Sequence, residues 1–202
     1  MSVCWNCEFQ VQDGWKFCPN CGTNLGDRTT GALYVVDATT GLFNAVFMQA
    51  VIGQEANRAV RYKRALSVLV VEADHAESIH REMSAAQLNQ LLKELADTLV
   101  RSVRDVDTVG FLEAEGPPHF VMVLPETDEA GALLAADKIR RSVASHDFQS
   151  GGNWQRLTVS VGIATVHHER IGPQDLIDQG FQALQNGRGS GPNRTTAFAL
   201  PH

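Results

Sequence analysis

Apolar and polar residues alternate along most of this chain in patterns that predict a succession of helices and strands. A helix is expected from Asn44, because apolar residues recur there at helical spacing. These residues are Val46, Phe47, Ala50, Val51 and Ala59. The run LSVLVVEA, residues 66–73, is typical of a buried strand, and residues 85–105 have a strong helical period.

The second half of the chain continues the alternation. TVGFLEA (108–114) and HFVMVLPET (119–127) are expected to pair as two strands, followed by a helix over 128–146. A strand over 156–166 and a weaker helix over 173–187 complete the series. This order favours an α/β fold in which a mixed sheet is flanked by amphipathic helices.

All four cysteines lie within the first 21 residues, as Cys4-x-x-Cys7 and Cys18-x-x-Cys21. Two such turns can aim four thiolates at one Zn²⁺ ion, and a closed shell of four sulfurs leaves no open position for catalysis. The alternative is two disulfides in a small secreted protein. The length of 202 residues and the lack of a basic stretch leading into an apolar core at the N-terminus disfavour it. The sequence therefore predicts a structural zinc site.

Residues 1–26 resemble the short zinc ribbons at the ends of many bacterial proteins, and residues 27–33 have the composition of a linker. Trp5 and Trp15 are candidates for stacking on bases or for docking a protein. The charges over residues 1–28 sum to -1, whereas a DNA-binding ribbon is normally basic. Protein contact is therefore the better hypothesis for this module.

Net charge and hydropathy disfavour two classes of protein, nucleic-acid-binding proteins and membrane-spanning proteins. The net charge of -6 disfavours a nucleic-acid partner held by bulk electrostatics. The longest apolar run, ALSVLVVEA, falls far short of the roughly 20 residues needed to cross a bilayer. A protein without a membrane span and with a cytoplasmic location is expected.

Four motifs in order resemble the GGDEF domain of bacterial diguanylate cyclases, a family that joins two GTP molecules into cyclic di-GMP. They are DATTGLFN (37–44), LPETDEAGALLAADKIR (124–140), LTVSVGIA (157–164) and GPNRT (191–195). The resemblance implies a nucleotidyl-cyclase-like mixed sheet flanked by helices. It extends through a second predicted domain, residues 34–198.

The signature that names the family falls on GPPHF, residues 116–120. In the family an acidic pair in this hairpin binds Mg²⁺, and a glycine pair lets the backbone approach the nucleotide. Pro117 and Pro118 offer no N–H, and neither they nor His119 carries an anionic oxygen for Mg²⁺. The resemblance therefore implies a hairpin without its metal site.

The preceding strand departs from the family in the same way. Glu72 stands where the family has its first metal-binding aspartate, and Asp74 is kept. His80 replaces the guanine-binding asparagine, while Leu88 and Asn89 replace a Gly-Asp pair. No diguanylate cyclase activity and no catalytic residue are expected. The alternative is a residual nucleotide-processing enzyme that uses Glu72 and Asp74 with an atypical metal arrangement.

Arg104 and Asp107 fit the R-x-x-D motif that binds cyclic di-GMP in relatives. Arginine can grip a guanine edge or a phosphate with two hydrogen bonds, and aspartate can accept from guanine N–H groups. The alternative is an ordinary local ion pair at the end of a helix. Eight residues separate this motif from residue 116, more than is usual in the family.

Two further groups of polar residues are weaker candidates. Arg58, Arg61, Lys63 and Arg64 end a helix, which indicates a solvated face that could still meet an anionic partner. His167-His168-Glu169, a conceivable metal group, is expected to form a loop, because adjacent side chains on an extended segment point apart. The overall hypothesis is a non-catalytic bacterial signalling protein with protein partners, compatible with a homodimer and with cyclic di-GMP as a ligand.

Overall fold

The computed structural model describes residues 2–3, 10–12, 25, 35–112, 117–150 and 153–199. The chain divides into two compact units, Met1–Val35 and Val36–His202. In the first unit, β1 (Ser2–Val3) and β2 (Gln10–Val11) pair antiparallel. The four cysteines predicted to bind zinc and the predicted linker lie outside the described residues, as does Gly116.

The second unit carries the remaining elements in an order close to the predicted one. They are α1 (Ala45–Tyr62), β3 (Leu66–Ala73), α2 (Ala76–Glu82), α3 (Ala85–Ser102), β4 (Thr108–Leu112), β5 (His119–Pro125), α4 (Glu129–Ala144), β6 (Asp147–Ser150), β7 (Asn153–Arg156), β8 (Val159–Val166), α5 (Pro173–Arg188) and β9 (Thr195–Ala197).

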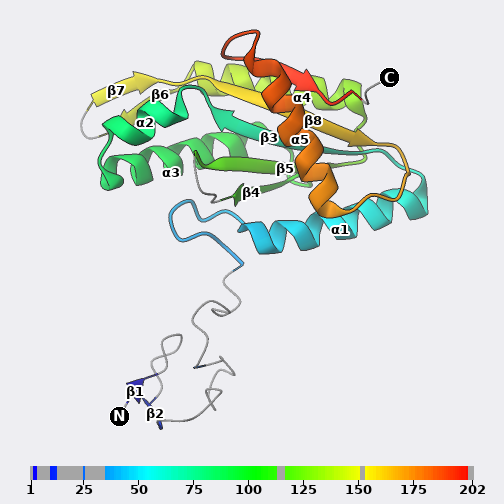
Figure 1. Cartoon of the computed structure of the whole chain (residues 1–202), viewed down its shortest axis with the longest axis horizontal. Coiled ribbons are helices and arrows are strands. Elements are labelled where there is room, and N and C mark those ends of the chain that lie inside the picture. Colours follow the sequence, from blue (N-terminus) through cyan, green and yellow to red (C-terminus); the bar gives the residue numbers. More distant parts are fainter. Residues whose placement is uncertain are drawn as a thin grey trace. The chain divides into compact units, whose positions relative to one another are not determined.

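Five of these strands form one mixed sheet in the order β4-β5-β3-β8-β9, visible across the middle of Figure 1. β3 lies at its centre, antiparallel to both β5 and β8. β8 and β9 are parallel and are joined through α5, the crossover connection that parallel strands require. β6 and β7 form a separate antiparallel pair.

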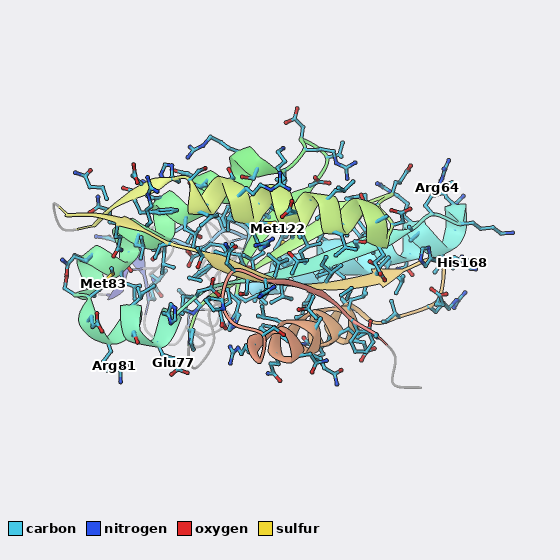
Figure 2. The ribbon with its side chains drawn as sticks, turned by 90° about the horizontal axis from the view of Figure 1, so that it is seen from above. Arg64, Glu77, Arg81, Met83, Met122 and His168 are labelled. Atoms are coloured by element: carbon cyan, nitrogen blue, oxygen red, sulfur yellow. The ribbon has the colours of Figure 1, made fainter. Side chains whose placement is uncertain are left out.

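Helices cover both faces of the sheet, and the alternation of β3 explains why. Leu66, Val68 and Val70 belong to one buried cluster with residues of α1 and α5. Leu69 and Val71 point the other way, into a cluster built with α3 and α4. Figure 2 shows α4 and α5 on opposite sides of the sheet. A strand buried on both faces reads as a continuous apolar run, as LSVLVVEA does.

The packing of α5 against the sheet depends on a close approach of backbones. A Cβ atom added to Gly162 of β8 would overlap the carbonyl oxygen of Gly180 and the amide nitrogen of Leu184. Gly180 in turn lies against Val70 of β3, where its own added Cβ would come within 2.7 Å of Cγ2. Two glycines therefore set how closely α5 lies on β3 and β8.

The mixed α/β architecture is as predicted, and β3, β4, β5 and β8 lie where the pattern placed them. The helix predicted from Asn44 is confirmed as α1, although of the five apolar residues that indicated it only Ala59 is fully buried. Val46 is 79% exposed, because the stripe that faces the sheet consists of Met48, Ile52, Ala56 and Ala59. The sequence pattern also did not predict α2, the β6–β7 hairpin or β9.

Candidate functional site

Glu72 lies near the end of β3 on the face covered by α5, two residues beyond Val70. Its carboxylate accepts hydrogen bonds from Arg188 Nη2, at 2.8 Å to each oxygen, and contacts His119 Nε2 at 2.6 Å through Oε2. Burial alone would raise the pKa of Glu72, but the hydrogen bond and charge of His119, together with Arg188, hold this pKa below its usual value. Glu72 is therefore an ionised carboxylate neutralised by protein side chains.

His119 reaches Glu72 because the two residues are directly opposite each other on β5 and β3. Its ring packs edge-on against Phe181 of α5, with ring centroids 4.7 Å apart. An ionised carboxylate only accepts hydrogen bonds, so the 2.6 Å contact places a hydrogen on Nε2. Within the described part of the chain, the buried Nδ1 has no hydrogen-bond partner. His119 thus serves as a donor to Glu72.

Asp74 is held by the strand next to it and by a loop. Its carboxylate accepts from Thr158 Oγ1 at 2.5 Å, Ser160 Oγ at 2.6 Å and the backbone N–H of Asn193 at 2.8 Å. Asn193 lies in the GPNRT segment and has a left-handed backbone with φ of 58°. Asp74 therefore anchors the loop that connects α5 to β9.

Arg140 of α4 fastens the same loop from the other side of the sheet. Its guanidinium donates to the carbonyl and side-chain oxygens of Asn193, at 2.5 and 2.6 Å, and to Thr195 Oγ1 at 3.0 Å. Asp137 orients this guanidinium at 2.9 Å. With Arg188 on Glu72, this loop is tied down at both of its ends.

A small apolar cavity lies beside this site, between α2, α3 and the sheet. Every side chain that lines it is apolar: Ala73, Ala76, Ile79, Leu88, Leu91, Leu92, Leu95, Pro118, Phe120 and Leu157. The family resemblance places the guanine-binding asparagine at His80 of α2, the residue after Ile79 of this lining. This lining supplies no side-chain hydrogen-bonding group for a base edge.

The R-x-x-D residues are brought together at the end of α3. Asp107 accepts hydrogen bonds from the backbone N–H of Arg104 at 2.9 Å and from its Nε and Nη2 at 3.2 and 3.1 Å. Arg104 Nη2 also donates to Thr127 Oγ1 at 2.6 Å. The pair is therefore a local ion pair, and a ligand would have to compete with it.

Two grooves meet at this ion pair. One, of about 550 Å³, is lined in part by Val36, Phe43 and Val100. The other, of about 310 Å³, is lined in part by Leu134 and Lys138. Arg104 and Asp107 line both, so the exposed part of the arginine lies where a ligand in either groove could reach it.

The remaining predicted groups do not form a metal site in the described part of the chain. His167 and His168 follow β8 in a loop, as predicted, and their backbone N–H groups donate to Glu169. Among residues 35–112, 117–150 and 153–199, and in the short described pieces before them, no cluster of three or more His, Cys, Asp or Glu could hold a metal ion. None of the helices described there is long and apolar enough to cross a membrane.

Sequence reasoning assigned no contact to Arg188 or Arg140, although Arg140 is the last residue of the motif 124–140. Their partners lie 116 and 53 residues away. Only the packing of α5 and α4 on the sheet brings them to the ends of β3 and β9. No signal in the sequence marks Arg188, whereas Arg140 stands in one of the four motifs of the family resemblance.

Comparison with known proteins agrees with this architecture. The family described as "Diguanylate cyclase, GGDEF domain" matches residues 34–194, and a zinc-ribbon domain family matches residues 3–25. The response regulator PleD of Caulobacter vibrioides is 27% identical over 169 residues, which cover 83% of this chain and 37% of PleD. The chain thus spans well under half of this relative.

Two solved structures share the fold. The GGDEF domain of DgcB from Caulobacter crescentus, in complex with c-di-GMP, matches with a TM-score of 0.73 and 19% identity over 82% of this chain and 94% of that one. The diguanylate cyclase SiaD of Pseudomonas aeruginosa, in complex with its activator SiaC, matches with a TM-score of 0.74 and 21% identity over 81% and 62%. The family match over residues 34–194 shows that the chain belongs to the GGDEF domain family, and the match over residues 3–25 shows a zinc-ribbon domain before it.

Proposed function

We propose that this protein is a non-catalytic bacterial signalling protein whose GGDEF domain acts as a protein-interaction module. The observation that carries the proposal is the state of Glu72. Its carboxylate stands where the family binds a metal ion, and it accepts hydrogen bonds from Arg188 and His119 instead. A Mg²⁺ ion at these oxygens would meet the guanidinium of Arg188, which donates to both of them.

The chemistry of phosphoryl transfer supports the same proposal. Joining two nucleoside triphosphates requires metal-bridged oxygens to neutralise the charge that develops on the transferred phosphoryl group. Asp74 is committed to three hydrogen bonds that hold a loop. Pro117 and Pro118 have no N–H to offer a phosphate. The cavity beside them is lined by apolar side chains.

Incubation with GTP or ATP in the presence of Mg²⁺ or Mn²⁺, followed by chromatography, tests this proposal. No dinucleotide is expected from the full chain, while an active diguanylate cyclase in the same buffer gives cyclic di-GMP. A dinucleotide product that disappears in Glu72→Gln would overturn the proposal. It would favour the alternative of a residual enzyme that uses Glu72 and Asp74.

A second function, as a cyclic di-GMP receptor, is favoured by one specific observation. The guanidinium of Arg104 is more than half exposed and lies where two grooves meet. DgcB, which shares the fold, has been crystallised with c-di-GMP. If the Arg104 guanidinium released one of its hydrogen bonds to Asp107, it could donate instead to a guanine edge or a phosphate.

Calorimetry with cyclic di-GMP separates the two functions. The receptor hypothesis expects heat of binding for the wild type, no heat for Arg104→Ala, and unchanged heat for Arg101→Ala, an exposed arginine in the last turn of α3, which ends two residues before Arg104. Absence of heat in the wild type would remove the receptor function and leave the interaction module.

The zinc ribbon is proposed to hold one structural Zn²⁺ through Cys4, Cys7, Cys18 and Cys21 and to contribute to partner contact. Thiolates are the donors that structural zinc prefers, and these are the four cysteines of the chain. Metal analysis is expected to find about one zinc per chain, lost in Cys18→Ser. Full zinc content in that variant would contradict this ligand set.

A further inference from the structure

A group of exposed cationic side chains surrounds a tyrosine at the end of α1. Arg58, Arg61, Tyr62, Lys63 and Arg64 form what we call the Tyr62 surface. β3 begins immediately beyond it at Leu66, whereas Glu72 is near the far end of the same strand. In Figure 2, Arg64 lies at one end of the domain, near His168, while Glu77 of α2 lies at the other.

Local structure explains why these side chains gather. Arg58 and Tyr62 are four residues apart and Arg58 and Arg61 three, so all three occupy neighbouring positions on one side of α1. Lys63 adopts the left-handed conformation, with φ of 52°, and ends the helix. The next residue turns back, and Arg64 lines a shallow depression together with Arg58. The four cations therefore converge on one area.

Tyr62 is the unusual member of this surface. It is 60% exposed and belongs to neither of the two buried clusters. The guanidinium of Arg61 lies over its ring, 5.5 Å from the centroid. At an exposed site this contact contributes roughly 0.5 to 1 kcal/mol and favours one arrangement of the ring and the cation. The ring of Tyr62 is therefore not part of the core, and core packing does not explain why an aromatic residue stands at this position.

The charges on the surface are mixed but mainly positive. Glu55 pairs with Arg58 at 3.0 Å, and Glu126 lines the same depression. Four cations against these two carboxylates give a local sum of +2 in a chain whose net charge is -6. A partner rich in acidic residues would be attracted to this area and repelled by much of the remaining chain.

We propose that the Tyr62 surface docks an acidic segment of a partner protein, with Tyr62 as the aromatic anchor and the arginines as carboxylate ligands. Tyrosine and arginine are the residue types enriched at the centres of protein interfaces. A protein can place single carboxylates opposite single arginines and avoid Glu55 and Glu126, whereas a nucleic-acid backbone cannot. This inference rests on the proposed interaction function and gives it a surface.

A fluorescein-labelled glutamate-rich peptide, with a glutamine-rich peptide as control, tests the proposal by fluorescence anisotropy. The triple variant Arg58→Gln/Arg61→Gln/Arg64→Gln is expected to bind the acidic peptide at least about tenfold more weakly, since each exposed charge contributes a modest amount. Lys93→Gln/Arg101→Gln/Arg141→Gln has the same net charge and is expected to remain within about twofold of wild type. Tyr62→Ala is expected to weaken binding several-fold. Equal binding by the two triple variants would overturn the proposal.

A photo-crosslinking residue placed at position 62 of the full chain in its bacterial host provides the second test. The proposal expects crosslinks to an acid-rich segment of one protein, absent when the crosslinker is placed at position 93. Tighter binding of duplex DNA or anionic phospholipid vesicles than of the acidic peptide would overturn it. A dinucleotide product in the GTP assay would instead contradict the proposed lack of catalysis, whatever the result with the peptide.

Discussion

Two arginine–carboxylate pairs in this domain have almost the same exposure, but their partners are separated by very different lengths of chain. Arg188 and Glu72 have side chains 55% and 13% exposed, and Arg104 and Asp107 have side chains 57% and 3% exposed. The first pair joins residues 116 positions apart in the sequence. The second joins residues three apart in one turn. Similar burial therefore says little about what each pair does for the fold.

The difference lies in what each pair connects. Glu72 and Arg188 link the central strand to the last helix, with His119 of β5 as a third member. Arg104 and Asp107 stabilise a single turn, in which the backbone N–H of Asp107 also donates to the carbonyl oxygen of Arg104 at 3.0 Å. A pair that closes a long loop forms only when the domain is packed, so its removal tests the tertiary structure. Removal of a local pair affects mainly the stability of its own turn.

The largest expected effect comes from removing the packing that brings Arg188 to Glu72. Gly162→Ala places a methyl group against backbone atoms of α5, which cannot move as a side chain can. Overpacking of this kind costs about 3 kcal/mol, so the melting temperature should fall by about 6 to 12 °C. Calorimetry or circular dichroism measures this.

Gly53→Ala is the matched control, because its added Cβ would meet Pro173 at an ordinary 3.9 Å within a helix. It should be neutral or stabilise by up to about 1 kcal/mol. A Gly162→Ala protein that melts with the control would show that the α5–β8 contact does not set the position of Arg188.

Double-mutant cycles compare the two pairs directly. For Glu72→Ala and Arg188→Ala, the coupling in the free energy of unfolding should be about 1 kcal/mol, a value reduced by the exposure of the arginine. For Arg104→Ala and Asp107→Ala it should be about 0.5 kcal/mol or less, as for local helix-end pairs. Urea titration measures both. A larger coupling in the local pair would reverse the comparison drawn above.

The pH dependence of the free energy of unfolding tests whether the pKa of Glu72 is lowered in the folded protein. His119 and Arg188 lower its folded-state pKa below the value near 4.3 expected in the unfolded chain, so below that pH the unfolded state binds the extra proton. The stabilisation is therefore complete above about pH 4.3 and is lost as the pH falls through the folded pKa. The stability difference between wild type and Glu72→Gln should therefore shrink as the pH falls below about 4.3 in urea titrations.

His119→Phe separates the two donors in that experiment. Without the hydrogen bond at 2.6 Å the pKa of Glu72 rises toward its usual value, and the acid-sensitive part of the stability becomes smaller. A pH profile unchanged in both Glu72→Gln and His119→Phe would contradict the lowered pKa.

The smallest expected effect belongs to the local pair on its own. Arg104→Ala should change the free energy of unfolding by less than about 0.5 kcal/mol, because the arginine side chain is more than half exposed and the backbone hydrogen bond of the turn does not depend on it. A melting temperature lowered as much as in Glu72→Ala would show that Arg104 has a role beyond its turn, for instance through its bond to Thr127.

The sequence predicted the central strand and its neighbours because a strand buried on both faces has an unmistakable apolar run. It also predicted that Arg104 and Asp107 could pair, since three residues of separation suffice. The sequence could not predict the partners of Glu72 and Asp74, because Arg188 and Asn193 approach these carboxylates only when α5 and β9 are packed in the fold. The pattern predicted the helix α1 but did not single out Met48 and Ile52 as its buried residues, since several apolar residues there compete for the sheet.

During synthesis on the ribosome, the two carboxylates of β3 are made long before the residues that they bind. Glu72 is synthesised 116 residues before Arg188, and Asp74 119 residues before Asn193. At elongation rates of about 5 to 20 residues per second, the nascent domain waits about 6 to 23 s before these partners are made. Until then its central strand presents negative charge at one end, and the arrival of the last helix both neutralises that charge and completes the core.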